Sequence, residues 1–323
     1  MMVLGRGKFA IDCIRTLQRL ASNCPLLVLA EIETGNCGLT LAQFCEQNEI
    51  ECSQYKRVNS DKNIELARLF APDLCLSLNN FQIINAQLLS IARQGAINFH
   101  NGPLPEYAGL NVCSHAIIGG ANQYGGTWHF MDESIDTGDI IARRMFPIAE
   151  DATALTLTIQ CAKVGLELFK ELVPVLATGE IPRQPMDKAA ISYFGRNDLP
   201  FDGDIDFRWP FAQLDRFVRG LNFHPLPNPF IYPRAIYCDK SLYISQVKEL
   251  NRVDARGAPG SILKIDENSI SVMLQDGAAQ LFDFLDANFE PISISDCVNK
   301  YNIRVGNRFM MPSDTTNSRK GPS

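Results

Sequence analysis

The sequence predicts an α/β protein with a Rossmann-like, mostly parallel sheet and a small C-terminal β-barrel-like domain. Over the first third of the 323-residue chain, short apolar runs alternate with amphipathic stretches, which is typical of parallel strands joined by helices. From about residue 235 the pattern becomes short alternating runs separated by Gly, Asn and Asp, which indicates antiparallel strands. We therefore expect a first domain over 1–200, a linker with one helix and a Pro-rich segment over 201–234, a β-rich domain over 235–312, and a disordered tail over 313–323.

Each predicted element rests on its own pattern. Apolar runs predict strands, and 3.6-residue periodicity predicts helices. The predicted strands of the first domain are 25–32, 73–79, 96–100 and 124–132, and the predicted helices are 39–50, 86–94 and 152–179. The last of these helices is expected to end at Gly179, with Pro182 just beyond. A further helix is predicted at 210–222, before the rigid segment HPLPNPF.

Composition narrows the class of protein. Hydrophobic residues make up 46% and charged residues 20%, as in ordinary globular proteins. The sequence has no run of about 18 apolar residues, so we expect no membrane span. The start, MMVLGRGKFAIDC, does not read as a signal peptide, and the ten cysteines form no CxxC pair. We expect a cytoplasmic protein with buried cysteines and without a metal site.

Charge argues against a nucleic-acid partner. The net charge is −6, and the chain from residue 201 onward carries 14 basic and 15 acidic side chains. A domain that holds a tRNA normally carries a basic excess, because phosphate contacts supply most of the affinity.

The residues with the clearest chemistry are Asn98, His100 and Asp136. The first two lie two positions apart at the end of a predicted strand, so their side chains point to the same side. Asp136 follows in a loop after another predicted strand, and open α/β folds place ligands at this edge of the sheet. The stiff loop NGPLPEYAG lies between them and can hold a substrate against the pair through Asn101, Pro103 and Tyr107.

An amide, an imidazole and a carboxylate at one sheet edge suit transfer of an acyl group between two nitrogens. Asn98 and a protonated His100 can donate to the oxyanion, and Asp136 can move the proton through His100 or a water. The alternative is that the histidine is an ordinary hydrogen-bonded packing residue at a strand end.

The segment Ile97–Ile140 resembles the active-site core of the 10-formyltetrahydrofolate-dependent formyltransferases. The likeness rests on an NxH pair, a proline-bearing loop and a DxGD motif, matched by Asn98, His100, Pro103, Pro105, Asp136, Gly138 and Asp139. It extends more weakly over roughly residues 1–235, and beyond that only in pattern. The resemblance implies a formyltransferase fold and activity, 10-formyltetrahydrofolate as co-substrate, no metal, and catalytic roles for Asn98, His100 and Asp136.

The resemblance also implies where the ligands bind. The pterin is expected against two loops, with Asn80, Phe81, Gln82, Ile83, Ile84, Met131, Asp132, Ile135 and Asp139 as candidate contacts. His129 lies on a strand expected to face the site, where it would shape the acceptor pocket or simply pack.

The acceptor amine is less defined. FHNGPLPEYAGLN, YFGRNDLP and LNFHPLPNPF are most similar to formyltransferase-like modules of nonribosomal peptide synthetases. This favours an amino-acid or carrier-tethered amine of natural-product biosynthesis. A nucleotide-linked aminosugar is an alternative, although the loop reads Tyr107-Ala108-Gly109 where many such enzymes carry an arginine. Methionyl-tRNA and water, the latter making the protein a 10-formyltetrahydrofolate hydrolase, are further alternatives.

A further interpretation, that the protein is an oxidoreductase, depends on the segment GRGKFA at 5–10, which fits the G-x-G-x-x-A dinucleotide fingerprint. The strand before it is very short, and the sequence offers no clear ribose-binding acid at the expected place. We expect these glycines to make a tight turn into the first helix.

Overall fold

The computed structural model describes residues 1–33, 38–250 and 257–312, and its contacts divide the chain into two compact units. The first contains Met1–Val112, Gln123–Pro147 and Thr158–Gly195. The second contains Cys113–Asn122, Ile148–Leu157 and the chain from Arg196 onward. The expected boundary near residue 200 stays a prediction, and the tail expected over 313–323 lies outside the described residues.

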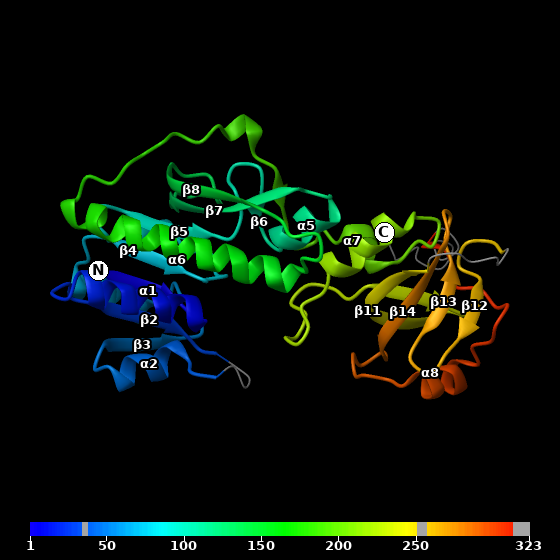
Figure 1. The fold of residues 1–323 in the computed structure, drawn as a ribbon. Helices are drawn as coiled ribbons and strands as arrows, with labels where there is room; N and C mark the ends of the chain where they lie inside the picture. Colours follow the sequence, from blue (N-terminus) through cyan, green and yellow to red (C-terminus); the bar gives the residue numbers. More distant parts are fainter. Residues whose placement is uncertain (34–37, 251–256, 313–323) are drawn as a thin grey trace, which may run out of the picture. The chain divides into compact units, whose positions relative to one another are not determined.

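A seven-stranded sheet forms the centre of the first unit (Figure 1). Its strands, in spatial order, are β3 (Glu51–Tyr55), β2 (Leu27–Glu31), β1 (Met2–Gly5), β4 (Cys75–Leu78), β5 (Ala96–His100), β7 (Gln123–Phe130) and β8 (Ile140–Pro147). The first five are parallel, whereas β7 runs antiparallel to both β5 and β8. The predicted mostly parallel sheet is confirmed.

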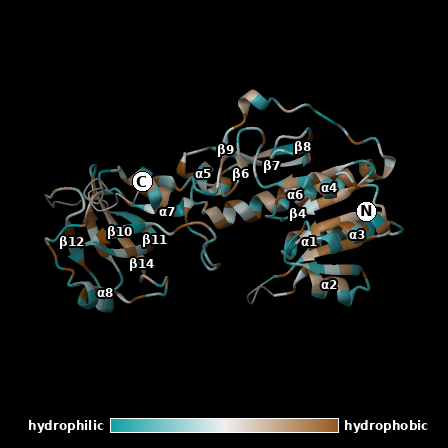
Figure 2. Cartoon of the chain, turned by 180° about the vertical axis from the view of Figure 1, so that it is seen from behind, coloured by the Kyte–Doolittle hydropathy of each residue, from teal (hydrophilic) through white to brown (hydrophobic). Residues whose placement is uncertain are grey.

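Helices cover both faces of this sheet (Figures 1 and 2). One face carries α1 (Gly7–Leu20), α2 (Leu41–Gln47) and α6 (Ala154–Thr178), and the other carries α3 (Asp61–Phe70) and α4 (Ala86–Leu89). Hydrophobic residues recur along α6, which packs against the sheet through Phe169 on Trp128 at 5.0 Å between ring centroids. Within the described residues, no helix combines the length and apolarity that crossing a membrane requires.

Two expectations for this unit need correction. The helix predicted over 86–94 is only the four-residue α4, which ends at the C-cap residue Ser90 and is followed by turns that lead into β5. The sequence analysis also lacked two strands, β3 and β8. In β8, buried and exposed residues alternate, as in an edge strand with one solvent-facing side.

Strand β5 packs against α6 through the Phe99 ring, which lies close to the backbone of the helix at Gly165. Phe99 points away from Asn98 and His100 and fits a space left by two glycines. A Cβ on Gly165 of α6 would lie 2.3 Å from the Phe99 ring, and one on Gly126 of β7 would lie 2.8 Å from it. Trp128 Nε1 donates to the Gly165 carbonyl at 2.9 Å, which fixes the helix over the strands.

The second unit contains an antiparallel five-stranded sheet, in agreement with the predicted β-rich C-terminal region. Its strands, in spatial order, are β10 (Arg234–Tyr237), β11 (Lys240–Leu250), β14 (Ala278–Leu285), β13 (Ile270–Met273) and β12 (Ile262–Ile265). The helices α7 (Phe211–Gly220) and α8 (Ile294–Tyr301) contribute Leu214, Phe217 and Cys297 to its core. Helix α5 (Val112–Ile118) also belongs to this unit, except for its first residue, Val112.

Candidate active site

Four polar side chains meet at the edge of the first unit's sheet. Asn98 and His100 come from the end of β5, His129 from β7, and Asp136 from the turn between β7 and β8. His100 Nδ1 lies 3.3 Å from one Asp136 oxygen, and His129 Nε2 lies 3.6 Å from the other. Asn98 Nδ2 lies 3.1 Å from His129 Nε2. The structure therefore brings together the three residues singled out in the sequence and adds a second histidine.

The local fold explains this meeting. Asn98 pairs with His129 in the antiparallel register of β5 and β7, which puts their side chains on the same face. In the turn that follows, Asp132 accepts from Ser134 N at 3.0 Å and from Thr137 Oγ1 at 2.6 Å. Asp136 has a positive φ of 54°, a left-handed conformation that aspartate adopts more readily than most residues.

A two-stranded ribbon holds the Asp136 carboxylate. The ribbon pairs β6 (Ala108–Gly109) with β9 (Tyr193–Phe194), and the Gly109 N–H donates to Asp136 Oδ2 at 2.8 Å. Gly109 has φ +99°, and a Cβ there would lie 2.1 Å from the Phe194 carbonyl oxygen. Only glycine fits, so this backbone donor requires a residue that the sequence analysis did not place at the site.

His100 is buried, at 6% exposure, and both of its ring nitrogens face oxygen acceptors. Nδ1 faces Asp136, while Nε2 lies 2.5 Å from the carbonyl oxygen of Tyr107. The Tyr107 ring in turn stacks on Phe194 at 5.9 Å. Contacts at both ring nitrogens fix the orientation of the His100 imidazole.

The loop after β5 is fastened to β7 by two side chains. Tyr124 Oη donates to the carbonyl of Asn101 at 2.9 Å, and Thr127 Oγ1 donates to the carbonyl of Gly102 at 2.8 Å. Thr127 Oγ1 also accepts from Leu104 N at 3.0 Å. Asn101, Pro103 and Tyr107 therefore lie in a firmly held loop, and their expected role toward a substrate stays a prediction.

His129 is at 2% exposure, and burial lowers its pKa from the ordinary 6.5 to about 4, with the nearby Asp136 acting in the opposite direction. Between pH 6.5 and 4, His129 therefore binds a proton in the unfolded chain but not in the folded chain. As the pH decreases through this range, the free energy of unfolding decreases by roughly 3 kcal/mol, and this decrease ends below about pH 4.

His129→Gln cannot titrate in this range, so its unfolding free energy should depend less on pH between 6.5 and 4 than that of the unchanged protein. Urea unfolding at several pH values measures the difference, with His224→Gln as the matched change of an exposed histidine. Parallel curves for His129→Gln and the unchanged protein would show that His129 is not held neutral.

The loop expected to meet the pterin is built largely by its own polar groups. Asn80 Oδ1 accepts from Gln82 N at 3.2 Å, and Asn80 Nδ2 donates to the Gln82 carbonyl at 2.8 Å. The Gln82 side chain donates to Glu31 Oε1 at 2.8 Å and accepts from Val58 N at 3.0 Å. These two polar side chains hold the loop in shape.

The apolar residues of the same loop differ in exposure. Phe81 is 56% exposed and Ile83 is 70% exposed, whereas Ile84 is 5% exposed and packs in the core with Met131 beside it. Phe81 and Ile83 are thus the residues with surface to offer a ligand. In the other loop, Asp139 pairs with Arg183 at 3.7 Å, and Ile135 is 44% exposed.

The dinucleotide interpretation of GRGKFA finds little support in the geometry. Glu31 does lie at the end of β2, where such folds carry a ribose-binding acid. However, Glu33 accepts from Gly7 N at 3.2 Å, at the start of α1. A carboxylate at this helix terminus repels the pyrophosphate that the fingerprint would bind there.

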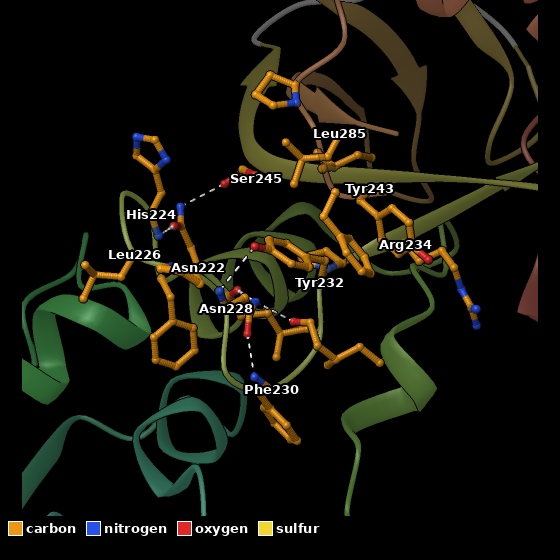
Figure 3. Close-up of a pocket in the computed structure, with 18 of the residues that line it drawn as sticks. Asn222, His224, Leu226, Asn228, Phe230, Tyr232, Arg234, Tyr243, Ser245 and Leu285 are labelled. Atoms are coloured by element: carbon orange, nitrogen blue, oxygen red, sulfur yellow. Dashed lines mark hydrogen bonds between the residues drawn. The ribbon is translucent and has the colours of Figure 1, made fainter. Parts of the chain in front are cut away.

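A separate cavity of about 760 Å³ lies within the second unit (Figure 3). Its walls include the Pro-rich segment and the ring cluster of Tyr232, Tyr243 and Phe289, with the rings of Tyr232 and Phe289 stacked at 4.9 Å. Asn228 Nδ2 donates to the carbonyls of Leu221 and Ile231, both at 2.7 Å, so this segment is fixed rather than loose.

Comparison with known proteins gives consistent matches. Residues 28–173 match the family described as "Formyl transferase", and residues 200–302 match "Formyl transferase, C-terminal domain". A GDP-perosamine N-formyltransferase of Brucella melitensis is 30% identical over 260 residues, which cover 80% of this chain and 96% of the relative. A methionyl-tRNA formyltransferase of Citrifermentans bemidjiense is 28% identical over 311 residues, 95% of each chain.

Among solved structures, the sugar 3N-formyl transferase WlaRD, crystallised in the presence of dTDP and 5-N-formyl-THF, superposes with a TM-score of 0.67. The two share 20% identity, and the match covers 87% of this chain and 96% of that one. At this identity the likeness concerns the fold.

Proposed function

The chain belongs to the formyl transferase family, and we propose that it transfers a formyl group from 10-formyltetrahydrofolate to the nitrogen of a primary amine. The observation that carries this proposal is the meeting of four polar side chains at one sheet edge, with the Asn98–His129 pair 3.1 Å apart, the His100–Asp136 pair 3.3 Å apart, and the two pairs joined at 3.6 Å between His129 and Asp136. Asn98, His100 and Asp136 supply a donor, an acid–base group and a carboxylate, as nitrogen-to-nitrogen acyl transfer needs.

The chemistry follows from these positions. The folate co-substrate supplies the formyl group. As the amine attacks, negative charge develops on the formyl oxygen, and the Asn98 amide can stabilise it by donating a hydrogen bond. The attacking nitrogen loses one proton and the departing nitrogen gains one. His100 and Asp136 form a proton path for this exchange, because Nδ1 and the carboxylate lie 3.3 Å apart.

The residues near this site fit a folate on one structural criterion. A pterin and its attached ring need apolar surface that the protein itself leaves uncovered. Ile83 offers such surface in a loop whose shape is already fixed by Asn80 and Gln82. Phe81 is 56% exposed as well, although the Arg6 guanidinium lies over its ring at 4.7 Å from the centroid. We propose these two residues, ahead of the buried Ile84, as folate contacts.

Ile83→Asp should therefore weaken binding of tetrahydrofolate about tenfold or more, since a charge replaces apolar contact surface. Isothermal titration calorimetry measures the change. Leu69→Asp is the control, because Leu69 is equally apolar and 78% exposed but lies on α3 outside the loop. Equal affinity of the two variants would place the folate elsewhere.

For the acceptor, a nucleotide-linked aminosugar is the class best supported by the comparisons. The 30%-identical relative is named for GDP-perosamine, and its match covers nearly its whole length. This favours the aminosugar over the amino-acid or carrier-tethered amine expected from the sequence. The near balance of 14 basic and 15 acidic residues from position 201 onward argues against tRNA, although a methionyl-tRNA formyltransferase matches over 95% of the chain.

The test is a panel of amines incubated with 10-formyltetrahydrofolate and read by mass spectrometry for the gain of one formyl group. The panel contains nucleotide-linked aminosugars, free and carrier-tethered amino acids, and methionyl-tRNA. Product with an aminosugar is expected. Formate release without any amine would instead identify a hydrolase, and no consumption of the folate under any condition would overturn the proposed function.

A further inference from the structure

The second histidine at the sheet edge has an environment that fixes where its proton lies. His129 Nδ1 is 2.7 Å from the carbonyl oxygen of Phe130, and a carbonyl can only accept. Nδ1 must therefore carry a hydrogen. Burial lowers the pKa of His129 and favours the neutral ring, although Asp136 Oδ1, 3.6 Å from Nε2, acts in the opposite direction. In the neutral ring with Nδ1 protonated, Nε2 presents a lone pair.

This lone pair determines the orientation of Asn98. The Asn98 amide places one terminal atom 3.1 Å from His129 Nε2. An amide oxygen there would face another acceptor, whereas the amide nitrogen can donate to it. Asn98 Nδ2 consequently faces the imidazole and gives it one of its two hydrogens.

On the basis of the proposed formyl transfer, we propose that His129 is a positioning residue that holds the Asn98 amide in its donating orientation. His129 accepts one Nδ2 hydrogen, and the second hydrogen remains for the developing charge on the formyl oxygen. Asn98 is partly exposed while His129 is buried, so Asn98 alone of this pair can reach a substrate. In this proposal the imidazole reaches the substrate through Asn98, and its contact with Asp136 at 3.6 Å lies on the side of the proton path.

Without His129 the Asn98 amide can flip, so that its oxygen and nitrogen exchange places. Its oxygen would then lie where the donor should be and would repel the negative formyl oxygen instead of stabilising it. The assignment differs from the pocket-wall and packing roles considered from the sequence, because it predicts energetic coupling between two specific side chains.

A double-mutant cycle tests this coupling. His129→Leu removes the acceptor and should lower kcat roughly tenfold, the size of one neutral hydrogen bond, with little change in KM for the folate. In an Asn98→Ala background the same change should alter kcat less than about twofold. His129→Gln keeps an oxygen acceptor and should recover part of the lost activity. Equal losses in both backgrounds would contradict the positioning role.

Nitrogen NMR of the histidine rings tests the same inference without turnover. At neutral pH, His129 should show protonated Nδ1 and bare Nε2, and Asn98→Ala should shift the Nε2 resonance. Protonated Nε2 would overturn the inference, even if His129→Leu failed to fold. Failure to consume the folate under any condition, by contrast, would overturn formyl transfer while leaving these resonances as expected.

Discussion

Asp136→Asn is expected to lower kcat by roughly 100- to 10,000-fold, the usual range for loss of a positioned acid–base group. Asparagine keeps the shape and can still accept the Gly109 N–H, but it cannot accept a proton from His100. The dissociation constant for the folate, measured by calorimetry, should change far less than kcat.

Glu133→Gln is the matched control, because it removes one exposed negative charge from the same turn. Its kcat should stay close to that of the unchanged protein. A folded Asp136→Asn protein that kept more than about a tenth of the kcat would contradict the proposed proton path.

His100→Ala should cost at least as much, because it removes the partner of Asp136 in that path. His100→Ala combined with Asp136→Asn should be little slower than the worse single variant, since groups that act as one unit fail together. Steady-state kinetics and melting temperature are measured on the same samples, with His224→Ala as an exposed control.

If the role of His100 is purely structural, different results are expected. Losing a buried ring would then lower the melting temperature, while kcat per folded molecule stayed nearly intact. Losses in rate that simply multiply between His100→Ala and Asp136→Asn would likewise show two independent effects.

Much of the sheet edge follows from one-dimensional patterns. Alternation in β5 places Asn98 and His100 on one face, and the apolar runs before it predict the parallel strands β2 and β4. The polar run of β3 gave no such signal. The direction of β7 and the presence of β8 do not follow, because a strand's pairing partner is set by the register of the whole sheet. Their antiparallel course is what brings Asp136 back to His100.

Two features of the site could not be predicted from the types of side chain in the sequence. The Gly109 donor is a backbone group, and its place depends on pairing between β6 and β9, more than 80 positions apart in the sequence. Ile84 was expected to face a pterin because it is apolar, but apolarity does not distinguish a ligand wall from the core, and Ile84 packs inward. The roles assigned to these residues stay predictions for the experiments above.

The contact between Phe99 and Gly165 has a consequence for the substitutions that this chain can tolerate. Phe99 lies between two residues of the proposed machinery, so the strand cannot shift outward without carrying Asn98 and His100 with it. A methyl group at position 165 would push on that ring from a helix that carries none of the four site residues. Substitution at this helical position is thus constrained by the chemistry of residues on β5. In a variant library, replacements of Gly165 should lower activity as often as replacements of the catalytic candidates.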